Sequence, residues 1–217
     1  MMRERFAASG IVLAGLLAGG CARNPEPSLV PPQTVEMDGD TLEKFAEEVH
    51  EYVKLRKSAL TKITPVATSS TPEQLTARQR ALTQAIVTYR KGKQRGNIFK
   101  PEVEAAIRRT LQREFTGPDG KALMKEIRSG NPRVEGNPRP RDPTQETLPR
   151  VTLAVNAVYP DAAPFSSVPP SLLRKLPVLP EVVRYRFVGR ALILRDTEAN
   201  VILDFIPDVV PDPTIPR

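Results

Sequence analysis

The chain of 217 residues contains one cysteine, one histidine and no tryptophan. A single cysteine excludes a disulfide framework, and together with a single histidine it supplies too few ligands for a Cys/His zinc site. The same shortage excludes most forms of Cys–His and Ser–His–Asp nucleophilic catalysis. We therefore predict no cofactor, no metal and no enzymatic activity for this sequence.

Apolar residues are also scarce, at 40% of the chain against about 45–50% in an average globular domain. Proline, by contrast, is abundant: the 23 prolines are about twice the number expected from an average usage of ~5%. A chain of this length and mass, 24.0 kDa, can form one domain with one modest core. Much of it is therefore predicted to be loop or extended structure.

The charge balance is basic, with 32 Lys+Arg against 25 Asp+Glu and a sequence pI near 9.7. In an intracellular protein, this excess would suggest a nucleic-acid partner. However, Arg3 and Arg5 precede an uncharged stretch, residues 6–20, in the layout of a signal peptide. Because a membrane-spanning helix needs about 20 apolar residues, we predict that residues 1–20 are removed on export.

The only cysteine follows this stretch directly, in the sequence Leu16-Leu17-Ala18-Gly19-Gly20-Cys21. This segment resembles the lipobox of bacterial lipoproteins, although Ala18 stands where an aliphatic residue is usual. The resemblance implies that the Cys21 thiol is acylated and that cleavage follows on its N-terminal side. The alternative is an ordinary signal peptide that is cut nearby, with Cys21 a free thiol.

The lipobox resemblance also implies a location and partners. We expect a protein of the bacterial cell envelope that is lipid-anchored and faces the periplasm, and Ala22 favours the outer membrane over the inner. Its expected partners are the membrane, through the lipid, and an envelope protein or anionic polymer. Nucleic acid is not expected.

The mature chain is predicted to be α+β. Residues 21–39 form a lipidated, proline-rich tether, 40–130 a small helical bundle, 131–180 a proline-rich segment with one strand, 181–206 an antiparallel β-meander and 207–217 an extended tail. The predicted strand of the middle segment is 151–158, which alternates apolar and polar residues. Gly189 and Asn200 are predicted to adopt positive φ at the two turns of the meander.

The helical region contains four apolar stripes with helical spacing. The first helix is predicted to begin at a capping-box variant of Asp40 and Glu43. The second begins with Thr71 as cap, Pro72 as first helical residue and Gln74 as reciprocal partner, and its apolar face is Leu75, Leu82, Ile86 and Tyr89. The third runs from Pro101 to Gly117, and a short fourth helix ends near Gly130.

The meander provides a second, weaker resemblance, carried by Tyr185-Arg-Phe-Val-Gly-Arg190 and Leu192-Ile-Leu-Arg-Asp196. These segments are similar to the small β-module of periplasmic proteins of the RcnB and CigR groups and to the ends of uncharacterised exported bacterial proteins. The resemblance implies a periplasmic accessory module and identifies no catalytic residue.

One dense basic segment is a candidate contact for an anionic surface: Arg90, Lys91, Lys93 and Arg95, at the end of the second helix. It lies in residues 78–150, which contain 17 basic and 8 acidic residues. A basic residue near an anionic membrane contributes about 1 kcal/mol of attraction. The alternative is that these residues are a solvated helix terminus whose charge matches the helix dipole.

The remaining candidates are carboxylates and one histidine. Asp196, Glu198, Asp204, Asp208 and Asp212 have turn-forming and solubilising roles in the simplest interpretation, whereas a hydrolase of envelope polymer would use Asp196 and Asp204. His50, without a second nitrogen or sulfur ligand, is predicted to be a surface or interface residue. The sequence thus favours a membrane-anchored accessory or binding protein over a hydrolase or a structural protein that docks on anionic polymer.

Overall fold

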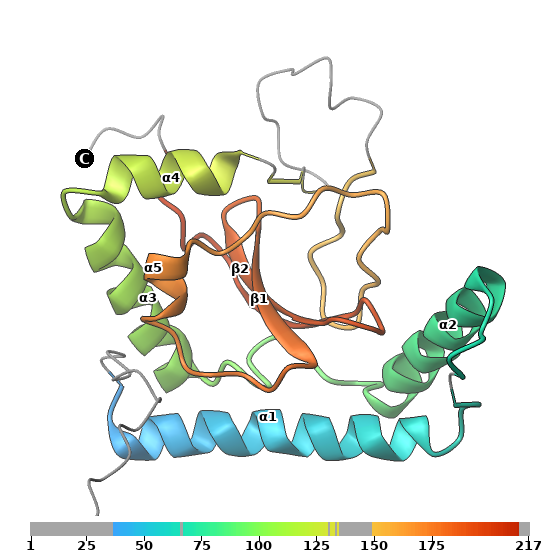
Figure 1. Ribbon diagram of the computed structural model, residues 1–217. Coiled ribbons are helices and arrows are strands. Elements are labelled where there is room, and N and C mark those ends of the chain that lie inside the picture. Colours follow the sequence, from blue (N-terminus) through green and yellow to red (C-terminus); the bar gives the residue numbers. More distant parts are fainter. Residues whose placement is uncertain (1–36, 66, 130, 133, 135–148, 213–217) are drawn as a thin grey trace, which may run out of the picture. The chain divides into compact units, whose positions relative to one another are not determined.

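The computed structural model describes residues 37–65, 67–129, 131–132, 134 and 149–212 (Figure 1). The described helices are α1 (Gly39–Leu60), α2 (Pro72–Tyr89), α3 (Pro101–Thr116), α4 (Gly120–Arg128) and the single turn α5 (Pro170–Leu173). The strands β1 (Val183–Val188), β2 (Ala191–Asp196) and β3 (Ile202–Ile206) form an antiparallel sheet in the order β1-β2-β3. The predicted α+β class and the C-terminal meander are confirmed. The predicted signal peptide, Cys21, residues 22–36 of the predicted tether and residues 213–217 lie outside the described residues.

The helix α1 begins two residues earlier than predicted. Its N-cap is Asp38, whose Oδ1 accepts a hydrogen bond from the backbone N–H of Thr41 at 2.7 Å, so the capping role predicted for Asp40 is wrong. A cap side chain must reach the third N–H of the helix, and Asp38 has that spacing to Thr41. The buried stripe of α1 consists of Thr41, Phe45, Val49, Tyr52, Arg56 and Ala59.

The helix α2 begins with the predicted capping box, in which the Thr71 side chain accepts from Gln74 N–H and the Gln74 side chain accepts from Thr71 N–H. Its apolar face is shorter than predicted. Leu82 and Ile86 are fully buried, but Leu75 is 45% exposed and Tyr89 41% exposed. The core contribution of α2 therefore comes from residues 82–87, in its C-terminal half.

The helices α3 and α4 follow each other closely. α3 begins at Pro101 as predicted, and α4 starts so near to its end that a Cβ atom at Gly120 would lie 2.0 Å from the Phe115 carbonyl oxygen. Only glycine fits there, because no real Cβ approaches a backbone oxygen so closely. This junction brings Leu123 and Ile127 of α4 into the same core as Phe115.

The strand predicted for 151–158 does not form. Only isolated bridges are present, Val134 with Val151 and Val158 with Val201. Asn156 interrupts the extended conformation with a φ of 66°, and its N–H donates to the Ile202 carbonyl of β3 at 2.8 Å. The segment therefore covers the sheet as a loop. Further along the predicted proline-rich segment, the single helical turn α5 was not predicted.

The three strands have two differently covered faces. Val183, Tyr185 and Phe187 of β1 alternate with Arg184, Arg186 and Val188, and the first set packs into the core shared with the helices. The second face packs against the 151–163 loop, in a smaller cluster of Val151, Tyr159, Ala163, Val188, Ile193 and Ile202. Gly189 and Asn200 have φ values of 60° and 58° at the two turns, as predicted.

Candidate functional site

The first residue of the predicted basic segment is not on the surface. Arg90 is 3% exposed; its Nη2 donates to the Leu203 carbonyl at 2.6 Å and its Nε to Asn156 Oδ1 at 2.9 Å. Burial lowers the pKa of this guanidinium, and the charge of Asp204 partly opposes the shift. The prediction that Arg90 contacts an anionic surface is wrong, because the end of α2 directs this side chain onto the irregular edge strand β3.

The other three members of the segment, Lys91, Lys93 and Arg95, are exposed. Arg95 is paired with Glu104 at 3.0 Å. Lys93 lines a depression of about 320 Å³ that also contains Glu48 and Glu51 of α1. Carboxylates therefore lie beside two of the three cations, and this lessens the attraction of the segment for an anion.

The loop that follows the basic segment is fixed by Asp204 on β3. This fully buried carboxylate accepts hydrogen bonds from the backbone N–H groups of Gly96 at 3.0 Å, Ile98 at 2.8 Å and Phe99 at 2.9 Å. Carboxylates that accept several backbone N–H bonds are held strongly. Asp204 is thus occupied by the fold, and the loop that presents Lys91 and Lys93 has a fixed conformation at its C-terminal end.

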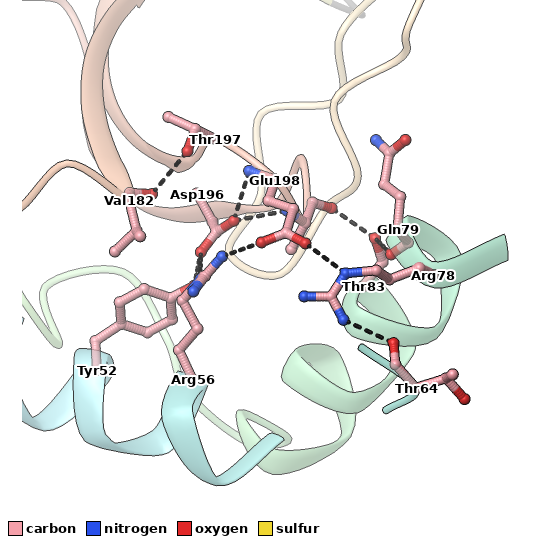
Figure 2. A network of polar contacts seen from close by, with 11 residues as sticks. Tyr52, Arg56, Thr64, Arg78, Gln79, Thr83, Val182, Asp196, Thr197 and Glu198 are labelled. Carbon is pink, nitrogen blue, oxygen red and sulfur yellow. Dashed lines mark hydrogen bonds and ion pairs between the residues drawn. The ribbon is translucent and has the colours of Figure 1, made fainter. Parts of the chain in front are cut away.

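A second buried carboxylate, Asp196, joins α1 to the turn between β2 and β3 (Figure 2). Its Oδ2 accepts from Tyr52 Oη at 2.6 Å and from Arg56 Nε at 2.8 Å. Its Oδ1 accepts from the backbone N–H groups of the turn residues Glu198 and Ala199. Burial and the charge of Asp196 raise the pKa of Tyr52 far above its usual value, so the phenol remains a donor.

Glu198 extends this network to α2. Its carboxylate pairs with Arg56 and, at 3.1 Å, with Arg78 Nε, while Arg78 Nη1 donates to the Thr64 carbonyl (Figure 2). The Thr83 hydroxyl donates to the Ala199 carbonyl at 2.6 Å. The turn after β2 is therefore bonded to both α1 and α2, and a change at any member would disturb the contact between helices and sheet.

These contacts test the roles that the sequence predicted for the carboxylates. Asp196 does form a turn, but neither it nor Asp204 has a solubilising role, because both are 0% exposed. Asp208 is exposed and pairs with Arg190 at 3.3 Å, and Asp212 pairs with the same arginine at 3.4 Å. His50 lies on the exposed side of α1, as predicted. The two carboxylates proposed for hydrolysis are therefore turned inward and fully bonded.

Sequence reasoning missed the structural roles of Arg56, Arg78 and Arg90. For Arg56 a signal was present: it stands four residues after Tyr52 and three before Ala59, so it belongs to the buried stripe of α1. A charged residue on such a stripe requires a buried partner. The partner, Asp196, is 140 residues away and could not be identified locally.

Among the described residues, no group of three or more His, Cys, Asp or Glu side chains is arranged to hold a metal ion. None of the described helices combines the length and apolar content needed to span a bilayer. Comparison with family models, curated proteins and solved structures found no match for this chain.

Proposed function

We propose that this protein is an exported lipoprotein of the bacterial cell envelope, whose folded body binds an envelope component without catalysing a reaction. The observation that carries the proposal is the segment Leu16-Leu17-Ala18-Gly19-Gly20-Cys21 after a short, uncharged stretch. Acylation there would supply about 0.8 kcal/mol of membrane affinity per buried methylene, and two or three chains give stable attachment. The proline-rich residues that follow would serve as the tether.

The charge of the mature chain agrees with an anionic partner. Removal of residues 1–20 takes away Arg3, Arg5 and Glu4, which leaves 30 Lys+Arg against 24 Asp+Glu. Outside the cytoplasm, phospholipid headgroups and envelope polymers are the polyanions within reach. The hydrolase alternative lacks support from Asp196 and Asp204, because neither carboxylate faces solvent.

Metabolic labelling with a fatty-acid analogue tests the anchor. The wild-type chain should be labelled and Cys21→Ser should not, because the label needs the thiol. Ala22→Asp is the matched control: it retains the thiol and should be labelled, but it should move the protein from the outer to the inner membrane on fractionation. Equal labelling of wild type and Cys21→Ser would contradict the proposal.

A second candidate function is electrostatic docking on anionic envelope polymer through Lys91 and Lys93. It is supported by the exposure of both lysines and by the bonds that fix the following loop to Asp204. Cosedimentation with phosphatidylglycerol vesicles, using Cys21→Ser chains to remove the lipid, should decrease with salt because such contacts are screened. Unchanged cosedimentation of Lys91→Gln/Lys93→Gln would refute the role of this pair.

A further inference from the structure

The second face of the sheet carries a cluster of three arginines from two adjacent strands. Arg184 and Arg186 alternate with the core residues of β1 and therefore point to the same side. Arg195 of β2 is paired directly with Arg184 in the strand register, which places it diagonal to Arg186. Directly opposite side chains in an antiparallel sheet have Cβ atoms about 4.5–5.5 Å apart. The three side chains thus leave the sheet from one small area of this face, and the charges of Arg184 and Arg195 both lie near that of Arg186.

Arg195 is held as a fixed donor in this area. It is 8% exposed, and its Nε donates to Asn200 Oδ1 at 2.5 Å. Its guanidinium lies 4.6 Å from the ring centroid of Phe165 and 5.5 Å from that of Tyr159, and the two rings are stacked. Such packing fixes the planar group while its remaining N–H donors stay available.

Arg186 and Arg184 bind only backbone carbonyls. Arg186 Nη1 donates to the Tyr185 carbonyl at 3.1 Å, and its buried Nε has no hydrogen-bond partner. The exposed Arg184 donates to the carbonyls of Val183 at 3.2 Å and Pro180 at 3.4 Å. In the described part of the chain, none of the three arginines forms an ion pair with a carboxylate.

The cluster is electrostatically unfavourable as it stands. Burial lowers the pKa of Arg186, and the neighbouring charge of Arg184 lowers it further. Burial and the charge of Arg186 also lower the pKa of Arg195, although the nearby charges of Asp196 and Asp161 oppose part of this shift. Asp161 accepts a hydrogen bond from Asn200 Nδ2 at 2.6 Å and forms no ion pair with the three arginines in the described residues. Like charges opposite each other destabilise a sheet, so a bound anion would relieve a cost that the fold now bears.

We propose that Arg184, Arg186 and Arg195 form a binding site for a phosphate-type oxyanion. Guanidinium groups suit this chemistry because their planar N–H pairs match the oxygens of phosphate. Phe165, 46% exposed, would stand at the rim of the site and contact apolar atoms attached to the phosphate. That the phosphate belongs to a lipid headgroup rests on the proposed envelope location, whereas the oxyanion site does not.

The test uses the full chain with Cys21→Ser, so that acyl chains hold no variant to vesicles. Inorganic phosphate should raise the thermal midpoint above that in chloride of equal ionic strength, and Arg186→Gln should weaken phosphate binding about tenfold through loss of a charged donor. The exposed Arg184→Gln should weaken it too and keeps the test valid if Arg186→Gln does not fold. Lys121→Gln/Lys125→Gln removes two exposed cations of α4 and should bind phosphate like the parent chain.

Vesicles distinguish the sources of phosphate. Binding to phosphatidylglycerol as well as to inorganic phosphate, with both lost in the arginine variants, supports a headgroup ligand. Binding to inorganic phosphate alone supports the site and overturns the headgroup as its source. If phosphate shifts the parent chain and both arginine variants equally, or if the lysine variant alone loses binding, the site is refuted. None of these outcomes alters the labelling result for Cys21, so the two proposals fail separately.

Discussion

On the face of the sheet that the helices cover, Arg56 is buried against Asp196, and Arg90 donates to a backbone carbonyl at the edge strand. On the opposite face, Arg186 and Arg195 lie beside each other and have no carboxylate partner in the described residues. The first arrangement gives each buried guanidinium acceptors, a carboxylate for Arg56 and a carbonyl and an amide oxygen for Arg90, whereas the second concentrates charge of one sign. The comparison indicates that arginines of the first face hold the fold together and that those of the second face bind a ligand.

The largest expected effect is on the compensated face. Asp196→Ala should lower the free energy of unfolding by about 3–5 kcal/mol, because it leaves Arg56 Nε, the Tyr52 hydroxyl and two turn N–H groups without their acceptor. Urea denaturation measures this loss. Asp208→Asn, which removes an exposed carboxylate, is the control and should stay within about 0.5 kcal/mol of wild type. A loss below about 1 kcal/mol for Asp196→Ala would contradict a structural role.

The next largest change in stability distinguishes Arg90 from its neighbour Lys91 in the basic segment. Arg90→Met should cost about 2–3 kcal/mol of stability, because the Leu203 carbonyl and the Asn156 side chain lose a charged donor. Lys91→Met, one residue further, should change stability by less than about 0.5 kcal/mol. Both are measured by urea denaturation. Equal losses of stability at the two positions would show that the hydrogen bonds of Arg90 to Leu203 and Asn156 do not stabilise the fold.

A pH-dependent effect is expected at Tyr159, which packs against Arg195 on the second face. Burial raises the pKa of Tyr159 from 10.0 to about 12, although the charges of Arg195 and Arg186 oppose this shift. The neutral phenol is therefore favoured in the folded state, and its stabilising contribution is complete below pH 10 and lost between pH 10 and about 12.

Tyr159→Phe should remove this part of the alkaline loss. Between pH 10 and 12, its free energy of unfolding should fall less steeply than that of wild type, as urea denaturation at several pH values would measure. Tyr52 and Tyr185, whose pKa values burial also raises, contribute equally to both proteins. Identical slopes would mean that Tyr159 titrates without a shift.

Local sequence patterns were sufficient to predict much of the fold. The apolar spacing of α3, the capping residues Thr71 and Gln74, and the turn residues Gly189 and Asn200 each determine nearby backbone, so they could be predicted from a few neighbours. The 151–158 segment misled the prediction because its alternation is real, but Asn156 turns the chain to bind Ile202, 46 residues further on.

The sites were less predictable because their partners are distant in sequence. Nothing near Arg56 or Arg90 points to Asp196 or Leu203, which only the assembled sheet brings into contact. The arginine cluster is easier to predict from the sequence. The two-residue turn at Gly189 pairs Val188 with Ala191, and counting back along both strands from that pair places Arg184 opposite Arg195.

The most direct test of the comparison makes the same substitution on both faces. In phosphate-free buffer, urea denaturation of Arg56→Gln and Arg186→Gln should give changes of opposite sign. Arg56→Gln should lose about 3 kcal/mol because it breaks a buried ion pair. Arg186→Gln should gain a few tenths to about 1 kcal/mol because it relieves repulsion within the cluster. A loss of more than about 1 kcal/mol for Arg186→Gln would show that this arginine also serves the fold, and would contradict the account.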